Sequence, residues 1–180
     1  DGFFDITVHS ENYTPSTISG IQLSSEAHTL FFQHSGININ LSGFLKGYAL
    51  ESIRELLQLY GIEDALVNMG NSSILALGHH PLATGWRIGF EQGFVSNKGE
   101  KQEVLLKNEC LTVSGNDSLE RKHIIAPYSG KLIEGKWMVA VVTESGAVGE
   151  ILSTAWFAAD TYQQKLLEME FHPRLILKLC

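Results

Sequence analysis

The chain reads Ile39-Asn40-Leu41-Ser42-Gly43-Phe44-Leu45-Lys46-Gly47-Tyr48-Ala49 at its most informative point. An apolar run enters a turn that contains Gly43 and Gly47, and a helical pattern follows directly. Glycine lets the backbone approach a ligand closely, and the N-terminus of a helix favours an anion. Lys46 adds a positive charge at the same point. The stretch therefore indicates either a phosphate site or an ordinary strand–turn–helix corner with a surface lysine.

Helical periodicity continues beyond this stretch. Apolar residues recur at i, i+3, i+4 and i+7 before Gly61, which predicts a helix over residues 48–60 (Ile53, Leu56, Leu57 and Tyr60). Two more helices are expected at residues 146–159 and 161–170, and Asp160 is placed to cap the second.

Short apolar and alternating runs predict the strands. They cover residues 29–33, 37–41, 65–69, 73–77, 86–90, 104–107, 111–113, 123–125, 137–143 and 174–179. Most gaps between them are too short for parallel crossovers. The expected fold class is therefore α+β, with mixed, largely antiparallel sheets and a few packed helices. We expect one domain over residues 1–180, with residues 39–41 and 65–69 as core strands.

Composition narrows the possible partners. The hydrophobic fraction of 44% and the charged fraction of 18% are ordinary for a globular protein. A formal net charge of -7 argues against a nucleic-acid binder, and no apolar run is long enough to span a membrane. The two cysteines, Cys110 and Cys180, form no C-x-x-C pair, and the apolar neighbours of Cys110 predict burial.

A second candidate site lies in the expected helix near the C-terminus. Glu150 and Thr154 stand at i and i+4, with Ser153 at i+3, so one carboxylate and two hydroxyls share a face. Such a sparse set of oxygen ligands suits Mg²⁺ when substrate phosphates complete its coordination. A polar helix face in water is the alternative interpretation.

A third candidate is His123, which follows Arg121-Lys122 and enters the short run Ile124-Ile125. The pKa of histidine suits proton transfer near neutral pH. A single histidine is also compatible with a packed or surface role. The remaining histidines are scattered, apart from a pair at residues 79–80, and none of them is assigned a role.

A fourth candidate is the corner Asn68-Met69-Gly70-Asn71 between two expected strands. Asparagine and glycine favour a tight turn. The same corner could also bring backbone amides to a ligand.

The order of these segments resembles the FAD:protein FMN transferase (ApbE-like) family. The matching segments run collinearly over nearly the whole chain: residues 4–8, 39–49, 66–78, 85–89, 113–115, 122–130 and 147–157. What that family has before the first of these segments is absent from the sequence. The chain also begins at Asp1 without Met, signal peptide or lipid-attachment Cys, so we interpret it as lacking the N-terminal portion of the family domain.

The resemblance implies Mg²⁺-dependent protein flavinylation: FMN moves from FAD to a Thr or Ser hydroxyl of an acceptor flavoprotein, and AMP is released. It implies that Mg²⁺ is held by Glu150 and Thr154, with Ser153 and the backbone near Gly43 as further ligands. It implies that His123 lies near the reacting phosphate as the catalytic residue. The flavin nucleotide would be bound by Asn40, Gly43, Lys46, Asn68, Gly70, Asn71 and Ile124. It also implies the bacterial cell envelope or periplasm as the compartment.

Several acidic positions depart from the family pattern. Asn40 and Ala126 stand where the family has Asp, and Glu150 replaces an Asp at the metal site. Glutamate can still ligate Mg²⁺. Losing the other two carboxylates favours the alternative of a non-catalytic relative that binds flavin or only a partner protein.

Overall fold

The centre of the fold is a five-stranded antiparallel sheet in a computed structural model that describes residues 2–90, 103–116, 123–135 and 137–179. The strand order is β11-β10-β7-β4-β3, and every neighbouring pair is antiparallel. The strands are β3 (Ala65–Met69), β4 (Ser73–Leu77), β7 (Glu109–Asn116), β10 (Trp137–Thr143) and β11 (Leu175–Leu179). The expected α+β class with largely antiparallel sheets is confirmed.

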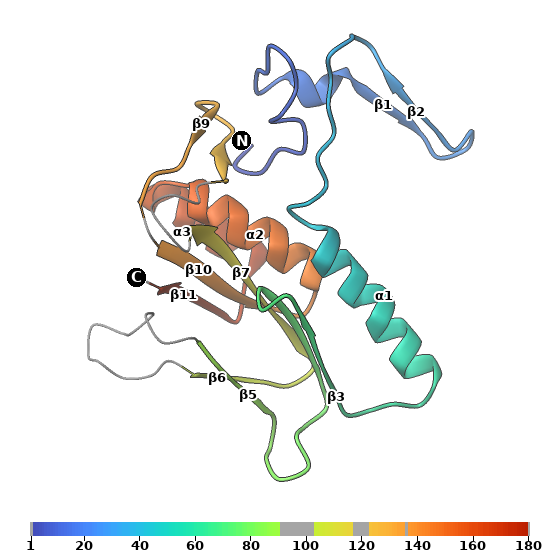
Figure 1. The fold of residues 1–180 in the computed structure, drawn as a ribbon, viewed down its shortest axis with the longest axis vertical. Coiled ribbons are helices and arrows are strands. Elements are labelled where there is room, and N and C mark those ends of the chain that lie inside the picture. The colour runs from blue at the N-terminus through green and yellow to red at the C-terminus, as the bar shows by residue number, and fades with distance from the viewer. Residues whose placement is uncertain (1, 91–102, 117–122, 136, 180) are drawn as a thin grey trace.

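Helices cover one face of this sheet. The helix α2 (Gly146–Ala158) crosses β7 and β10, α1 (Leu45–Leu59) lies beside α2, and α3 (Thr161–Phe171) follows α2 (Figure 1). Two clusters fill the interface. Leu50 of α1 packs with Leu75, Leu77 and Cys110 of the strands, and the other cluster contains Val139, Val141, Leu152 and Phe157.

A hairpin covers the opposite face. It is formed by β5 (Trp86–Gly89) and β6 (Glu103–Leu106). Its Val104 and Leu106 pack with the sheet residues that point away from the helices (Ile74, Ala76, Leu111, Ala140 and Val142). The sheet is therefore buried on both faces, which explains why β4 and β10 are mostly apolar.

The helix ends follow the sequence signals. Gly61 has φ +70° directly beyond α1, and Asp160 forms a capping box with Gln163 at the start of α3. However, α1 begins at Leu45, three residues earlier than expected at 48. The expected apolar stripe is only partly right: Ile53 and Leu57 pack against the core, whereas Leu56 is 52% exposed and Tyr60 is 73% exposed.

The N-terminal segment, residues 2–44, differs from the predicted pattern. The 3-10 helix η1 (Thr17–Gly20) leads into a hairpin of β1 (Ile21–Ser24) and β2 (Thr29–Phe32), which projects from the body (Figure 1). The predicted strand over residues 37–41 is wrong, because that stretch joins no sheet and β2 pairs with β1 instead. The Asn40 N–H donates to the carbonyl of Ile6 at 2.7 Å, so its hydrogen bonds serve a loop–loop contact.

The segment after β7 is also shifted. The strand predicted at residues 123–125 is the short β8 (Ile125–Ala126), which pairs with β9 (Lys131–Leu132). Residues 117–122, including Arg121 and Lys122, lie outside the described residues. None of the helices in the described part of the chain combines the length and apolar character needed to cross a bilayer.

Candidate active site

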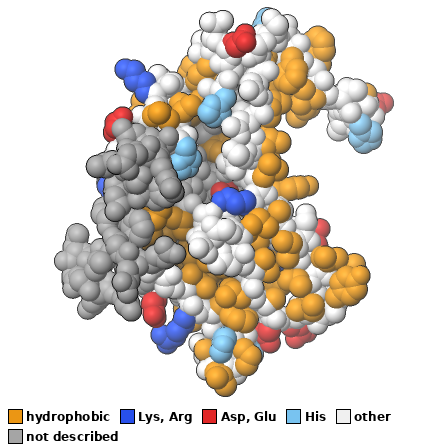
Figure 2. All heavy atoms as spheres, in the orientation of Figure 1, with side chains coloured by type: hydrophobic (Ala, Val, Ile, Leu, Met, Phe, Trp, Pro, Cys, Tyr) orange, Lys and Arg blue, Asp and Glu red, His pale blue; other side chains and the backbone are white. Residues whose placement is uncertain are grey.

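A cavity of about 870 Å³ is lined by the N-terminal segment, the start of α1, the helix α2, the central sheet and the strand β5. Its lining includes most of the residues proposed from the sequence: Asn40, Gly43, Lys46, Asn68, Gly70, Asn71, His123, Ile124, Glu150 and Thr154. On the face shown in Figure 2, histidine side chains and a basic side chain lie close together. The structure therefore brings together candidates that come from distant parts of the sequence.

The first wall of the cavity is the turn into α1. Asn40 Oδ1 accepts the N–H of Ser42 at 2.9 Å, so the amide supports the turn as an aspartate would, but without a charge. The helix α1 has no side-chain N-cap. Gly43, just before the helix, and Lys46, in its first turn, both line the cavity, and the N–H groups of Phe44 and Leu45 donate to the Leu41 carbonyl. A helix N-terminus beside an ammonium group favours an anion.

Glu150 is the only acidic side chain that α2 brings to the cavity, and it is only 3% exposed. Its carboxylate accepts a hydrogen bond from Ser73 of β4, and Oε1 lies 3.7 Å from Lys46 Nζ. Burial raises the pKa of Glu150, and the Ser73 hydroxyl and the Lys46 charge oppose that rise. Lys46 also donates to Ser72, so a single ammonium group bridges the two walls.

Thr154 lines the cavity and belongs to a row of hydrogen-bonded hydroxyl groups. Ser114 Oγ lies 3.0 Å from Thr154 Oγ1 and 2.7 Å from Ser153 Oγ. Ser153 donates to the Glu150 carbonyl at 3.1 Å. Because Ser153 donates to the Glu150 carbonyl, its oxygen can accept the hydroxyl of Ser114, and Ser114 can in turn accept the hydroxyl of Thr154. In this arrangement the lone pairs of Thr154 Oγ1 stay available to a ligand.

Ser153 itself is fully buried beneath the cavity and is not part of its lining. Its hydroxyl is used by Ser114 and by the helix backbone. This placement favours Thr154 over Ser153 as the hydroxyl ligand, in contrast to the expectation that both contribute.

The corner between β3 and β4 forms another wall. Gly70 and Asn71 have φ values of +66° and +60°, and the Asn68 side chain holds the corner by accepting the Asn71 N–H at 2.9 Å. The amide of Asn68 also donates to Asn71 Oδ1 at 2.9 Å. These side chains are therefore locked to each other at the cavity edge.

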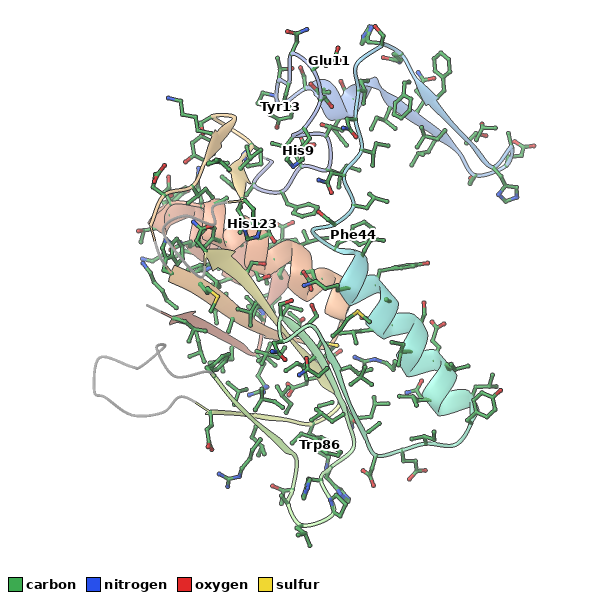
Figure 3. The ribbon with its side chains drawn as sticks, viewed as in Figure 1. His9, Glu11, Tyr13, Phe44, Trp86 and His123 are labelled. Carbon is green, nitrogen blue, oxygen red and sulfur yellow. The ribbon has the colours of Figure 1, made fainter. Side chains whose placement is uncertain are left out.

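Two histidines line the cavity from different segments. His123 precedes β8, and its neighbour Ile124 is buried in the core with its carbonyl accepting the Ile133 N–H. His9 comes from the N-terminal segment, and Figure 3 shows both side chains on the same side of the molecule. Sequence reasoning assigned no role to His9, and its only available signal was its position directly after the family-like segment at residues 4–8.

Sequence reasoning also missed several polar residues of the site. Ser73 and Ser114 point from β4 and β7 to α2, and Ser72 holds Lys46. They lie inside or directly beside quoted motifs, so motif position was the available signal. Gly47 was interpreted as a possible approach point for a ligand, but it lies inside α1 against α2.

The donor set can be compared with the requirements of a metal ion. The described residues contain no group of three or more His, Cys, Asp or Glu side chains that could hold an ion. Glu150 and Thr154 supply one carboxylate and one hydroxyl on adjacent turns of α2. Mg²⁺ is commonly bound by one or two carboxylates together with substrate phosphates and water, so the residues fit a site of that kind and no closed protein cage.

Residues 1–174 match the ApbE family, and the chain therefore belongs to that family.

Relatives with curated names agree with this assignment. A Rhodobacter capsulatus protein named FAD:protein FMN transferase is 26% identical over 174 residues, which is 92% of this chain and 31% of the relative. A Vibrio cholerae protein of the same name is 27% identical over 146 residues, which is 76% of this chain and 43% of the relative. The chain thus spans less than half the length of these relatives.

Solved structures agree in fold. The flavin transferase ApbE from Vibrio cholerae superposes with a TM-score of 0.75 at 22% identity, over 89% of this chain and 52% of that one. The ApbE protein from Thermotoga maritima gives a TM-score of 0.73 at 21% identity, over 89% and 54%.

Proposed function

We propose that this chain binds FAD in the cavity and transfers FMN to a Thr or Ser hydroxyl of an acceptor flavoprotein, releasing AMP in a Mg²⁺-dependent reaction. The observation that carries the proposal is the meeting of Lys46, Glu150, Thr154 and His123 on one cavity. The names of the relatives supply the reaction class.

Binding would rest on the start of α1. The diphosphate of FAD is an anion, and the start of α1 offers the positive end of the helix dipole together with the Lys46 ammonium group. The Asn68–Asn71 corner and Ile124 would border the nucleotide. Apolar lining residues such as Leu66, Val113 and Met138 offer a surface for a flat ring.

Chemistry would rest on positioning and charge. Glu150 and Thr154 would hold Mg²⁺, which would neutralise charge on the diphosphate. Lys46 would stay in contact with the phosphate and balance its negative charge while the hydroxyl attacks phosphorus and the bond to AMP breaks. His123 would take the proton from the acceptor hydroxyl, which is a poor nucleophile at neutral pH.

The direct test incubates the chain with FAD, Mg²⁺ and a candidate acceptor, followed by a denaturing gel read for flavin fluorescence. We expect a fluorescent acceptor band that requires both FAD and Mg²⁺, and we expect AMP in equal amount. A Thr-to-Val change at the acceptor site is the matched control. Absence of a band with several acceptors would contradict transfer.

Two observations favour a second function. Lys46 lies 3.7 Å from the carboxylate that would hold the metal, and the family aspartates are replaced at Asn40 and Ala126. A non-catalytic relative that binds flavin or a partner protein would tolerate these changes. It would bind FAD without Mg²⁺ and yield no AMP.

A location in the bacterial cell envelope remains part of the proposal, and fractionation of the native host would test it.

A further inference from the structure

The helices α1 and α2 touch through their backbones next to the site. A Cβ atom at Gly47 would lie 2.1 Å from the carbonyl oxygen of Gly146 and 2.7 Å from the Ala147 nitrogen. Real side chains do not approach backbone this closely, so glycine is required at position 47 for the helices to cross at this distance. In the reverse direction a Cβ at Gly146 would lie 2.9 Å from the Gly47 carbonyl oxygen.

Side chains reinforce this crossing. Glu51, one turn after Gly47, accepts the N–H of Gly146 with Oε1. Its other carboxylate oxygen lies 3.5 Å from Arg54 Nε, and Arg54 Nη2 donates to the Glu144 carbonyl at 2.6 Å. The start of α2 is thereby tied to α1 by a carboxylate and by the arginine beside it.

The crossing lies directly next to the charged pair. Lys46 precedes Gly47 in α1, and Glu150 stands one turn after Gly146 in α2. The closest approach of the two backbones therefore sets the distance between the Lys46 ammonium group and the Glu150 carboxylate. A shift of about 1 Å at reacting groups can cost about 10²-fold in rate.

We propose that Gly47 and Glu51 are positioning residues that hold Lys46 and Glu150 at their working separation in the cavity. Neither residue is part of the cavity lining, so both act through the helix crossing. The inference concerns the protein alone, and its importance for FMN transfer rests on the function proposed above.

The test reads the Lys46 ammonium group directly by ¹H–¹⁵N NMR of the unliganded chain. Lys46→Arg assigns the signal. Hydrogen bonding to Ser72 beside Glu150 should slow exchange of the ammonium protons, so that the wild-type chain gives an observable cross-peak. We expect Gly47→Ala and Glu51→Ala to abolish or shift this peak. Glu51→Gln, which keeps an oxygen to accept the Gly146 N–H, should retain it.

Two controls separate positioning from general loss of stability. Glu55→Ala changes an exposed acidic residue of the same helix, and it should leave the peak unchanged. Leu167→Ala removes a partly buried side chain of α3 that packs on the core away from the cavity. It should lower the unfolding midpoint and still retain the peak.

A second readout measures binding, using Mn²⁺ as the probe ion with FAD. The Mn²⁺ concentration for half-maximal FAD binding should rise by about tenfold or more in Gly47→Ala and Glu51→Ala, and by less in Glu51→Gln. An unchanged Lys46 peak in Gly47→Ala, or its loss in Leu167→Ala, would overturn the inference. If the peaks behave as expected but the wild type binds no FAD, positioning stands and the proposed function fails.

Discussion

The sheet body and the N-terminal segment build the two sides of one cavity by different means. The body has strands buried on both faces, and β4 is buried along its whole length. In residues 2–44 only Thr7, Ser10 and Gly20 are buried, and most residues of the hairpin β1–β2 are exposed. Yet this segment supplies Asp5, His9, Asn40 and Gly43 to the cavity.

The segment is held by polar contacts in place of a core. Asp5 accepts the N–H and the hydroxyl of Thr7 at 2.7 and 2.6 Å, and the hydroxyl of Tyr13 at 3.0 Å. Burial and the contact with Asp5 raise the pKa of Tyr13 to about 12. The comparison shows that packing of the sheet body positions Glu150, whereas hydrogen bonds hold the N-terminal segment that lies over the cavity.

The largest effect is expected for His123, and His9 on the other side of the cavity serves as its comparison. His123→Ala should lower FMN transfer by about 10²–10⁴-fold, the usual range for general acid–base catalysis, with little change in FAD affinity. His9→Ala should cost less than about tenfold and act on FAD affinity. Initial rates of flavinylation and fluorescence titration of FAD measure both. Equal losses would remove the distinction between the two sides, and loss of FAD binding with transfer intact would make His123 a binding residue.

Glu150→Gln tests the role of the negative charge that α2 brings to the cavity. Transfer should fall by about 10²–10³-fold, because the carboxylate proposed to hold Mg²⁺ at the diphosphate is lost. Stability should move in the opposite direction. The pKa of Glu150 is raised in the folded protein, so its ionisation above the ordinary glutamate pKa disfavours folding. Thermal unfolding at neutral pH should therefore show an unchanged or higher midpoint for Glu150→Gln, and the fall in stability with rising pH should be weaker.

Asp5→Ala weakens the hydrogen bonds of the N-terminal segment, and its effect is compared with that of a core substitution in the sheet body. It removes three hydrogen bonds, so FAD affinity should fall by about tenfold while global stability changes by only about 1 kcal/mol. Leu75→Ala in the fully buried strand β4 should cost about 2–5 kcal/mol. Urea unfolding and FAD titration on both variants check this. A loss of stability in Asp5→Ala as large as that in Leu75→Ala would show that the segment folds as one unit with the body.

The last effect, which is confined to alkaline pH, concerns Cys110 beneath α1. Burial raises the pKa of its thiol to about 11, and the nearby Arg54 guanidinium only partly opposes this. The unfolded chain then loses this proton first, so stability should fall as pH rises from about 9 to 11, by about 2–3 kcal/mol. Cys110→Ala should lack this part of the pH dependence in urea unfolding. An identical pH dependence in both chains would contradict it.

Local patterns predicted the body better than the segment. The strand β10 and the helices α2 and α3 follow the sequence within a residue at either end, because apolar periodicity and caps act locally. Residues 37–41 have a similar apolar pattern but pair with no strand. Whether such a run joins a sheet depends on which edge is available, and no local pattern contains that information.

For the site, motif order predicted which residues would meet. Lys46, Glu150, Thr154 and His123 all line the cavity, although their roles stay predictions. The supporting serines were missed because serine has no distinctive local signal, and Gly47 was noticed but given a different role. Ser73 and Ser114 gain their meaning from facing α2 across the sheet.

The sequence by itself determined the α+β class, the ends of α2 and α3 to within a residue, and the identities of the charged residues at the site. Propensity, capping and side-chain chemistry are properties of short stretches, so they can be recognised without the fold. Only the tertiary structure decided that Gly47 serves a helix crossing, that Ser153 lies beneath the cavity and that Lys46 stands beside Glu150. These are distances between elements far apart in the chain, and close packing of the whole body sets them.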